Sequence, residues 1–64
     1  MSEKPRCKLV GEDGNVFNLL GKVSRTLRQH KMNKEANECV DRVLHSAHSY
    51  DEALRIMMDY VEVY

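Results

Sequence analysis

The stretch Gly11-Glu12-Asp13-Gly14-Asn15 decides how this chain folds, because it separates a short alternating run from the most regular helical pattern. Asp-Gly is a strong turn signal, since glycine accepts positive φ without a Cβ clash and aspartate can bond nearby backbone N–H groups. We therefore expect the chain to reverse here, with Gly14 at positive φ. Asn15 directly precedes an apolar run, and we expect it to cap the helix that follows.

The same turn has a functional alternative, which is an exposed polar site made by Glu12, Asp13 and Asn15. Two acidic residues beside the positive end of a helix dipole argue against an anionic ligand. The turn also lacks the ligand series of a calcium loop. We favour the structural interpretation.

Length and charge bound the possible classes of protein. The chain has 64 residues, with ten basic and ten acidic residues and a formal charge of zero. We expect a disordered tail or the lead-in to an edge strand over residues 1–5, and a single compact domain over residues 6–64. Nothing in the overall charge indicates nucleic acid or an anionic membrane as a partner.

Hydropathy and cysteine usage bear on localisation. No apolar run reaches transmembrane length, and the first residues lack the apolar stretch of a secretion signal. We expect a cytoplasmic protein. Cys7 and Cys39 lie among apolar neighbours, so we expect them to be reduced and buried.

The apolar periodicity predicts a mostly helical α+β fold in the order strand, helix, helix, helix, short terminal strand. Gly21 lies inside the first helix at a cost of roughly 1 kcal/mol relative to alanine, which suggests a close neighbouring backbone. We expect the inward-facing apolar residues to include Phe17, Leu44, Tyr50 and Met58. The expected elements are a strand from Arg6 to Val10, helices from Val16 to about Lys31 and from Lys34 to about Ala47, a third helix after Ser49, and a strand from Val61 to Tyr64.

Two further caps are expected. Asn33 precedes the second helix and can cap it. Ser49 and Glu52 form a capping box, in which Ser49 accepts from the Glu52 N–H while the Glu52 carboxylate reaches back to Ser49.

The third helix predicts self-association. Its apolar arc is wider than one face, and the alternating tail offers an unpaired strand edge that a second copy can satisfy. The alternative is that the two short strands pair within one chain and the extra apolar residues rest on the first helix. We expect a homodimer or larger closed oligomer whose interface comprises Ile56, Met57, Tyr60, Val61, Val63 and Tyr64.

The first helix carries one basic cluster, Lys22, Arg25, Arg28 and Lys31. These four residues are the candidates for nucleic-acid binding. We favour a solvated face, because the chain has no basic excess and shows no aromatic platform for stacking bases.

Chemistry-bearing motifs are sparse. His45 and His48 are three residues apart, with Cys39 earlier on the same helix, but a metal site needs three or four ligands. We expect no metal, no cofactor and no catalytic residues, since no phosphate loop, nucleophile elbow or relay spacing occurs. Enzyme activity is not expected.

Several pieces of the chain resemble short, uncharacterised proteins of bacteriophages and integrated mobile elements of Gram-positive bacteria. The resemblance rests on residues 8–17, on Leu20-Gly21 and Leu27-Arg28, on Tyr50-Asp51, and on residues 58–63. It implies a mobile-element origin and no assigned activity. By analogy with small phage proteins, it suggests an inhibitor or anti-defence adaptor that binds a host or phage protein.

The leading functional hypothesis is therefore a small, non-enzymatic protein-interaction module. A nucleic-acid binder using the basic face of the first helix is the alternative. A sequestering pocket for a small ligand at a subunit interface is a third possibility.

Overall fold

A computed structural model describes residues 4–9 and 14–64 of the chain, and within them the fold is the expected mostly helical α+β unit. The expected reversal and polar site at Glu12 and Asp13 lie outside the described residues, as does Val10. None of the helices within the described part is long and apolar enough to cross a membrane. The elements are β1 (Arg6–Cys7), α1 (Val16–Gln29), α2 (Asn33–Ser46), α3 (Tyr50–Met58) and β2 (Glu62–Val63).

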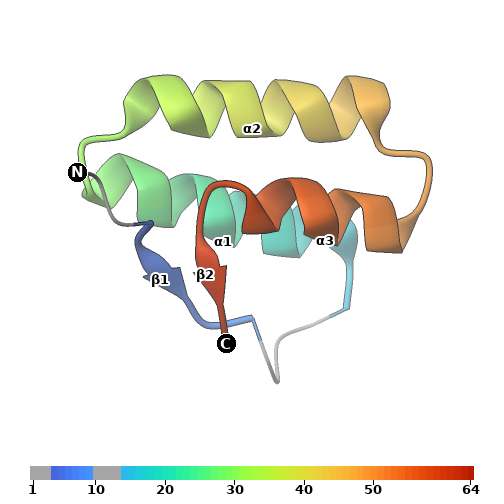
Figure 1. The fold of residues 1–64 in the computed structure, drawn as a ribbon, viewed down its shortest axis with the longest axis horizontal. Coiled ribbons are helices and arrows are strands. Elements are labelled where there is room, and N and C mark those ends of the chain that lie inside the picture. Colours follow the sequence, from blue (N-terminus) through green and yellow to red (C-terminus); the bar gives the residue numbers. More distant parts are fainter. Residues whose placement is uncertain (1–3, 10–13) are drawn as a thin grey trace.

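The helices and strands form layers. In Figure 1, α2 lies along one side, α1 and α3 lie beneath it, and the two strands lie on the side away from α2. The strand β1 packs on α1 and pairs with β2. The core between these layers consists of Cys7, Leu9, Leu19, Leu20, Val23, Leu27, Ala36, Cys39, Val43, Ala53, Met57, Tyr60 and Val61. Both cysteines are free and buried, as their apolar neighbours predicted.

The strands β1 and β2 pair in parallel within one chain, with Arg6 opposite Glu62 and Cys7 opposite Val63. The Leu9 N–H extends the ladder by donating to the Tyr64 carbonyl oxygen at 2.7 Å. Intrachain pairing is thus correct, and β1 occupies one edge of the terminal segment.

The first described residues are part of the fold. Pro5 is buried, and its carbonyl oxygen accepts a 2.9 Å hydrogen bond from the Glu62 N–H. The Lys4 Nζ donates to the Met58 carbonyl oxygen at 3.0 Å. Lys4 and Pro5 therefore lead into the edge of the sheet, which is the second of the two expectations for this end of the chain.

The helix α1 begins where its cap predicts and ends earlier than expected. The Asn15 side chain accepts a 2.8 Å hydrogen bond from the Phe17 N–H, which confirms Asn15 as the N-cap. At the other end, Lys31 has a φ of 61°. The Met32 N–H donates to the Leu27 carbonyl oxygen at 2.8 Å, and the Lys31 N–H to the Arg28 carbonyl oxygen at 3.0 Å. This is a Schellman C-cap, so Lys31 terminates the helix instead of belonging to it.

The caps of α2 and α3 differ in part from expectation. Asn33 is the first residue of α2, and Met32 precedes it without a side-chain cap, so Asn33 is not the N-cap. Ser49 does cap α3, since its Oγ accepts from the Glu52 N–H at 3.2 Å. The Glu52 carboxylate accepts from the His48 N–H at 3.4 Å and not from Ser49. In the expected capping box the Glu52 carboxylate accepts from the N-cap residue itself, whereas here it accepts from the residue before the N-cap.

The two glycines that carried structural expectations are unconstrained. The φ of Gly14 lies outside the left-handed range, and a Cβ added to it meets no atom of the described residues within 4 Å. Gly21 is exposed, and a Cβ there also meets no atom within 4 Å. Gly14 is therefore not in the left-handed conformation that was expected, and no backbone of the described residues lies close to Gly21.

Candidate functional site

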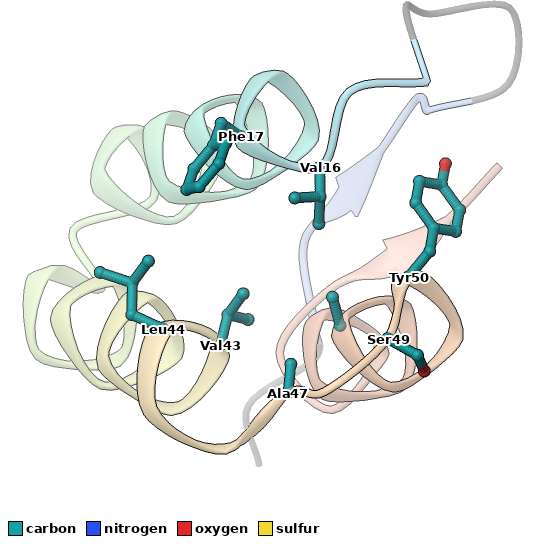
Figure 2. A pocket seen from close by; sticks show the side chains of 8 residues that line it. Val16, Phe17, Val43, Leu44, Ala47, Ser49 and Tyr50 are labelled. Atoms are coloured by element: carbon teal, nitrogen blue, oxygen red, sulfur yellow. The ribbon is translucent and has the colours of Figure 1, made fainter.

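An open apolar groove lies where α1 begins, α2 ends and α3 begins. Its volume is about 370 Å³. Figure 2 shows Val16 and Val43 pointing into the space between the helices, Phe17 and Leu44 along one side of it, and Tyr50 on the opposite side. The lining residues are Val16, Phe17, Val43, Leu44, Ala47, Ser49, Tyr50 and Ala53, and we call this surface the apolar groove.

Local sequence signals position the groove. The Asn15 cap starts α1 at Val16, which places Val16 and Phe17 in its first turn. The Ser49 cap starts α3 at Tyr50. The short connection from α2 to α3 therefore holds two helix ends beside the first turn of α1.

Three large apolar side chains of the groove are exposed to solvent. The exposed fraction is 66% for Phe17, 56% for Leu44 and 45% for Tyr50. All three were expected to face inward, and that expectation is wrong. Adjacent helical residues are about 100° apart around the axis, so when Val16 and Val43 face the interior, Phe17 and Leu44 point aside. Met58, also expected inward, is exposed elsewhere on the surface.

The groove has the chemistry of a recognition surface. None of the described residues that line it is charged. The Ser49 hydroxyl oxygen already accepts a hydrogen bond from the Glu52 N–H. Such a surface can take up apolar groups from a ligand, and exposed aromatic side chains next to a hollow are typical anchors of protein interfaces.

The four residues of the basic cluster do not form one surface. Arg28 donates to the Asn37 Oδ1 at 2.8 Å and to the Ser24 Oγ at 3.3 Å, so it joins α1 to α2. Lys31 lies in the C-cap turn. Lys22 and Arg25 remain together on the outer face of α1, where they line a second, polar depression with Phe17, Asn18, Gly21, Thr26 and Gln29.

Most of the predicted dimer interface lies inside the single chain. Met57, Tyr60 and Val61 belong to the core. Ile56 and Val63 are half-buried and pack against that core. Tyr64 is exposed, with the Arg6 guanidinium 4.7 Å from its ring centroid. A second copy can therefore reach only Ile56, Val63 and Tyr64 of the six residues.

A polar cluster joins α2 to the residues after α3. The Tyr60 hydroxyl donates to the Glu38 Oε1 at 2.7 Å, and Arg42 Nη1 donates to the same hydroxyl at 3.2 Å. Arg42 Nη1 also lies 3.4 Å from the Asp59 Oδ2. Burial raises the pKa of Tyr60, and Arg42 partly opposes that rise. The phenol stays neutral, and the cluster acts as a link between elements.

Cys39 does not have the features of a reactive cysteine. It is fully buried, and burial raises the pKa of its thiol from 9.0 to about 11 despite the nearby Arg42. The thiolate is the nucleophilic and metal-binding form, so the neutral thiol is inert at physiological pH.

The histidine pair shows only local contacts. The His45 Nδ1 lies 3.0 Å from the Asp41 Oδ1, one turn earlier on α2. Among residues 4–9 and 14–64, no group of three or more His, Cys, Asp or Glu residues is placed to hold a metal ion.

Comparisons with protein families, with curated proteins and with solved structures find no significant match to this chain. Function is therefore argued from the site alone.

Sequence reasoning missed the apolar groove because it assigned Phe17, Leu44 and Tyr50 to the inward-facing sides of their helices. The available signal was the pair of adjacent apolar residues at Val16-Phe17 and again at Val43-Leu44. Adjacent helical residues are about 100° apart, so one member of such a pair can face the core while the other lies at its margin.

Proposed function

We propose that the protein is a small, non-enzymatic interaction module that binds an apolar segment of another protein in the apolar groove. The observation that carries this proposal is the exposure of Phe17, Leu44 and Tyr50 around one hollow. Contiguous exposed apolar side chains are costly in water, and they commonly mark sites of protein association. If the partner belongs to a host or to a phage, the module acts as an inhibitor or adaptor by occupying that partner's surface.

The experiment is affinity capture from a host lysate after nuclease treatment, with matched variants. Phe17→Ser/Leu44→Ser removes two anchors that contribute little to the core, because both side chains are exposed. Met58→Ser removes another exposed apolar side chain, outside the groove, and serves as the control. Circular dichroism checks that each variant is folded.

We expect the wild type and Met58→Ser to capture the same partner, and Phe17→Ser/Leu44→Ser to lose it. Equal capture by all three proteins would refute the groove as the binding site. Truncation of a central apolar anchor typically weakens binding by about 2 kcal/mol or more, which is enough to empty a pull-down.

A nucleic-acid binder is the second candidate, and one observation favours it. Phe17 lines the same depression as Lys22 and Arg25, so an exposed ring lies beside two basic residues. Aromatic rings and cations together can bind single strands by stacking and charge. Against it stand the zero net charge and the engagement of Arg28 with Asn37. Loss of the captured material on nuclease treatment would support this candidate.

A homodimer also remains a prediction. A chain of this length has a small core, and a second copy can bury further apolar surface. The exposed apolar residues now indicate the groove, and not the end of α3, as the surface to test by sedimentation equilibrium.

A further inference from the structure

Phe17 belongs to two neighbouring hollows of different character. One is the apolar groove, and the other is the polar depression on the outer face of α1 that contains Lys22 and Arg25. Among residues 4–9 and 14–64, no acidic residue lines either hollow. A ligand that passes over the Phe17 ring therefore meets apolar side chains on one side and positive charge on the other.

Arg25 is the clearest charge of this surface. It is exposed, and within the described ranges 4–9 and 14–64 no hydrogen bond or ion pair engages its guanidinium. This contrasts with Arg28 and Arg42, which are held by Asn37 and by Tyr60 and Asp59. A planar guanidinium presents paired N–H donors that match a carboxylate, so Arg25 is available to bind an acidic side chain of a partner.

The spacing suits a helix. Phe17 and Arg25 are eight positions apart on α1, which corresponds to about 12 Å along its axis. A helix that lies along α1 covers this distance in about two turns. Its apolar side chains, repeating every three or four residues, can enter the groove while an acidic side chain about two turns away reaches Arg25.

We propose that the segment bound in the apolar groove is an acidic amphipathic helix, whose apolar face contacts Phe17 and Leu44 and whose carboxylates face Arg25. This rests on the proposed function. Because the net charge of the chain is zero, discrimination comes from this local charge and not from the overall field. The described residues of the groove lining are apolar or uncharged, which favours a protein segment over a nucleic acid, because phosphates are bound mainly by basic side chains.

The test uses three labelled, designed peptides of about 18 residues, long enough for a few helical turns. They share one apolar stripe, and their flanking positions are all Glu, all Gln or all Lys. Fluorescence anisotropy gives the Kd of each peptide for the wild type, for Arg25→Glu, for Lys34→Glu and for Phe17→Ser/Leu44→Ser. Lys34 is exposed on α2 and lines neither hollow. Lys34→Glu therefore makes the same change of charge outside the proposed binding surface.

We expect the Kd of the Glu peptide for the wild type to be at least about tenfold lower than that of the Lys peptide. A tenfold ratio of Kd values corresponds to about 1.4 kcal/mol of binding free energy. Arg25→Glu should reverse that order, and Lys34→Glu should keep it. The preference should shrink as salt is raised from about 50 to 500 mM, because exposed charges are screened.

Four results overturn the inference. Equal Kd values for the three peptides, all weakened by Phe17→Ser/Leu44→Ser, would leave the groove as a binding site and remove the charge preference. Micromolar binding of a single-stranded oligonucleotide that disappears in Arg25→Glu would assign the surface to nucleic acid. A wild-type dimer that Phe17→Ser/Leu44→Ser dissociates would assign the groove to a second copy. Failure of all three peptides to bind also overturns it, whereas the proposed function fails separately if capture from lysate ignores Phe17 and Leu44.

Discussion

The Tyr60 hydroxyl donates a 2.7 Å hydrogen bond to the Glu38 carboxylate. This bond joins the turn that follows α3 to the middle of α2. The ring of Tyr60 is in the core, while its hydroxyl reaches the surface where Glu38 and Arg42 lie. A buried tyrosine needs a partner for its hydroxyl, and this pair supplies it. The bond also fixes the point at which the chain leaves α3 and turns toward β2.

Tyr60→Phe should lower the free energy of unfolding by about 1 kcal/mol. Hydrogen bonds to charged groups contribute more than neutral ones, but Glu38 is exposed and water competes for it. Urea denaturation measures the change. Tyr50→Phe is the control, because Tyr50 is exposed and its hydroxyl makes no hydrogen bond to the described residues; it should change stability by less than about 0.5 kcal/mol. Equal effects of the two substitutions would contradict a specific role for the Tyr60 hydroxyl.

Lys31→Gly should raise the free energy of unfolding by about 0.5 to 1 kcal/mol. Lys31 has a φ of 61°, a conformation that costs a residue with a Cβ more than it costs glycine. The gain is reduced because glycine also adds freedom to the unfolded chain. Thermal and urea denaturation give the value.

The matched control for Lys31→Gly is Lys34→Gly, in the first turn of α2. The same substitution there meets an ordinary helical backbone and should lower stability by up to about 1 kcal/mol. Changes of the same sign at both positions would show that the Schellman conformation of Lys31 is not the cause.

Gly21→Ala should raise the free energy of unfolding by about 1 kcal/mol, since alanine is the better helix former and the added methyl group meets no atom within 4 Å. The result is read from the urea midpoint. Destabilisation would mean that a neighbouring group approaches Gly21 more closely than the structure shows.

Stability should fall in alkali through Cys39. Burial raises the pKa of the folded thiol from 9.0 to about 11, so the folded state keeps its proton where the unfolded state loses it. The stabilisation is complete below the unfolded pKa and is lost as the pH rises from 9.0 to about 11, by about 2 to 3 kcal/mol in all.

The measurement is the urea midpoint of the wild type and of Cys39→Ala between pH 7 and the upper end of that range. Tyrosine and lysine titrate there too, but they do so in both proteins. We expect the wild-type curve to fall more steeply than that of Cys39→Ala. Parallel curves would mean that Cys39 does not titrate between its folded and unfolded values.

Local signals in the sequence were sufficient to define the elements and two of their ends. Asn15 and Ser49 cap α1 and α3 because a cap depends only on one side chain and the next two or three N–H groups. The apolar periods of the helices also follow from neighbours in sequence, and they predicted the mostly helical α+β order. The C-cap at Lys31 was missed because its residue type carries no glycine signal.

Only the tertiary structure decided which apolar residues are buried and which form the groove. Phe17 and Leu44 are apolar members of regular helices, yet each points aside because α1, α2 and α3 meet at Val16, Val43 and Ala53. The parallel pairing of β1 with β2, and the bond from Tyr60 to Glu38, join residues far apart in the chain. Such contacts depend on how the helices pack together, and a periodicity that is read within one helix contains no information about the position of the next.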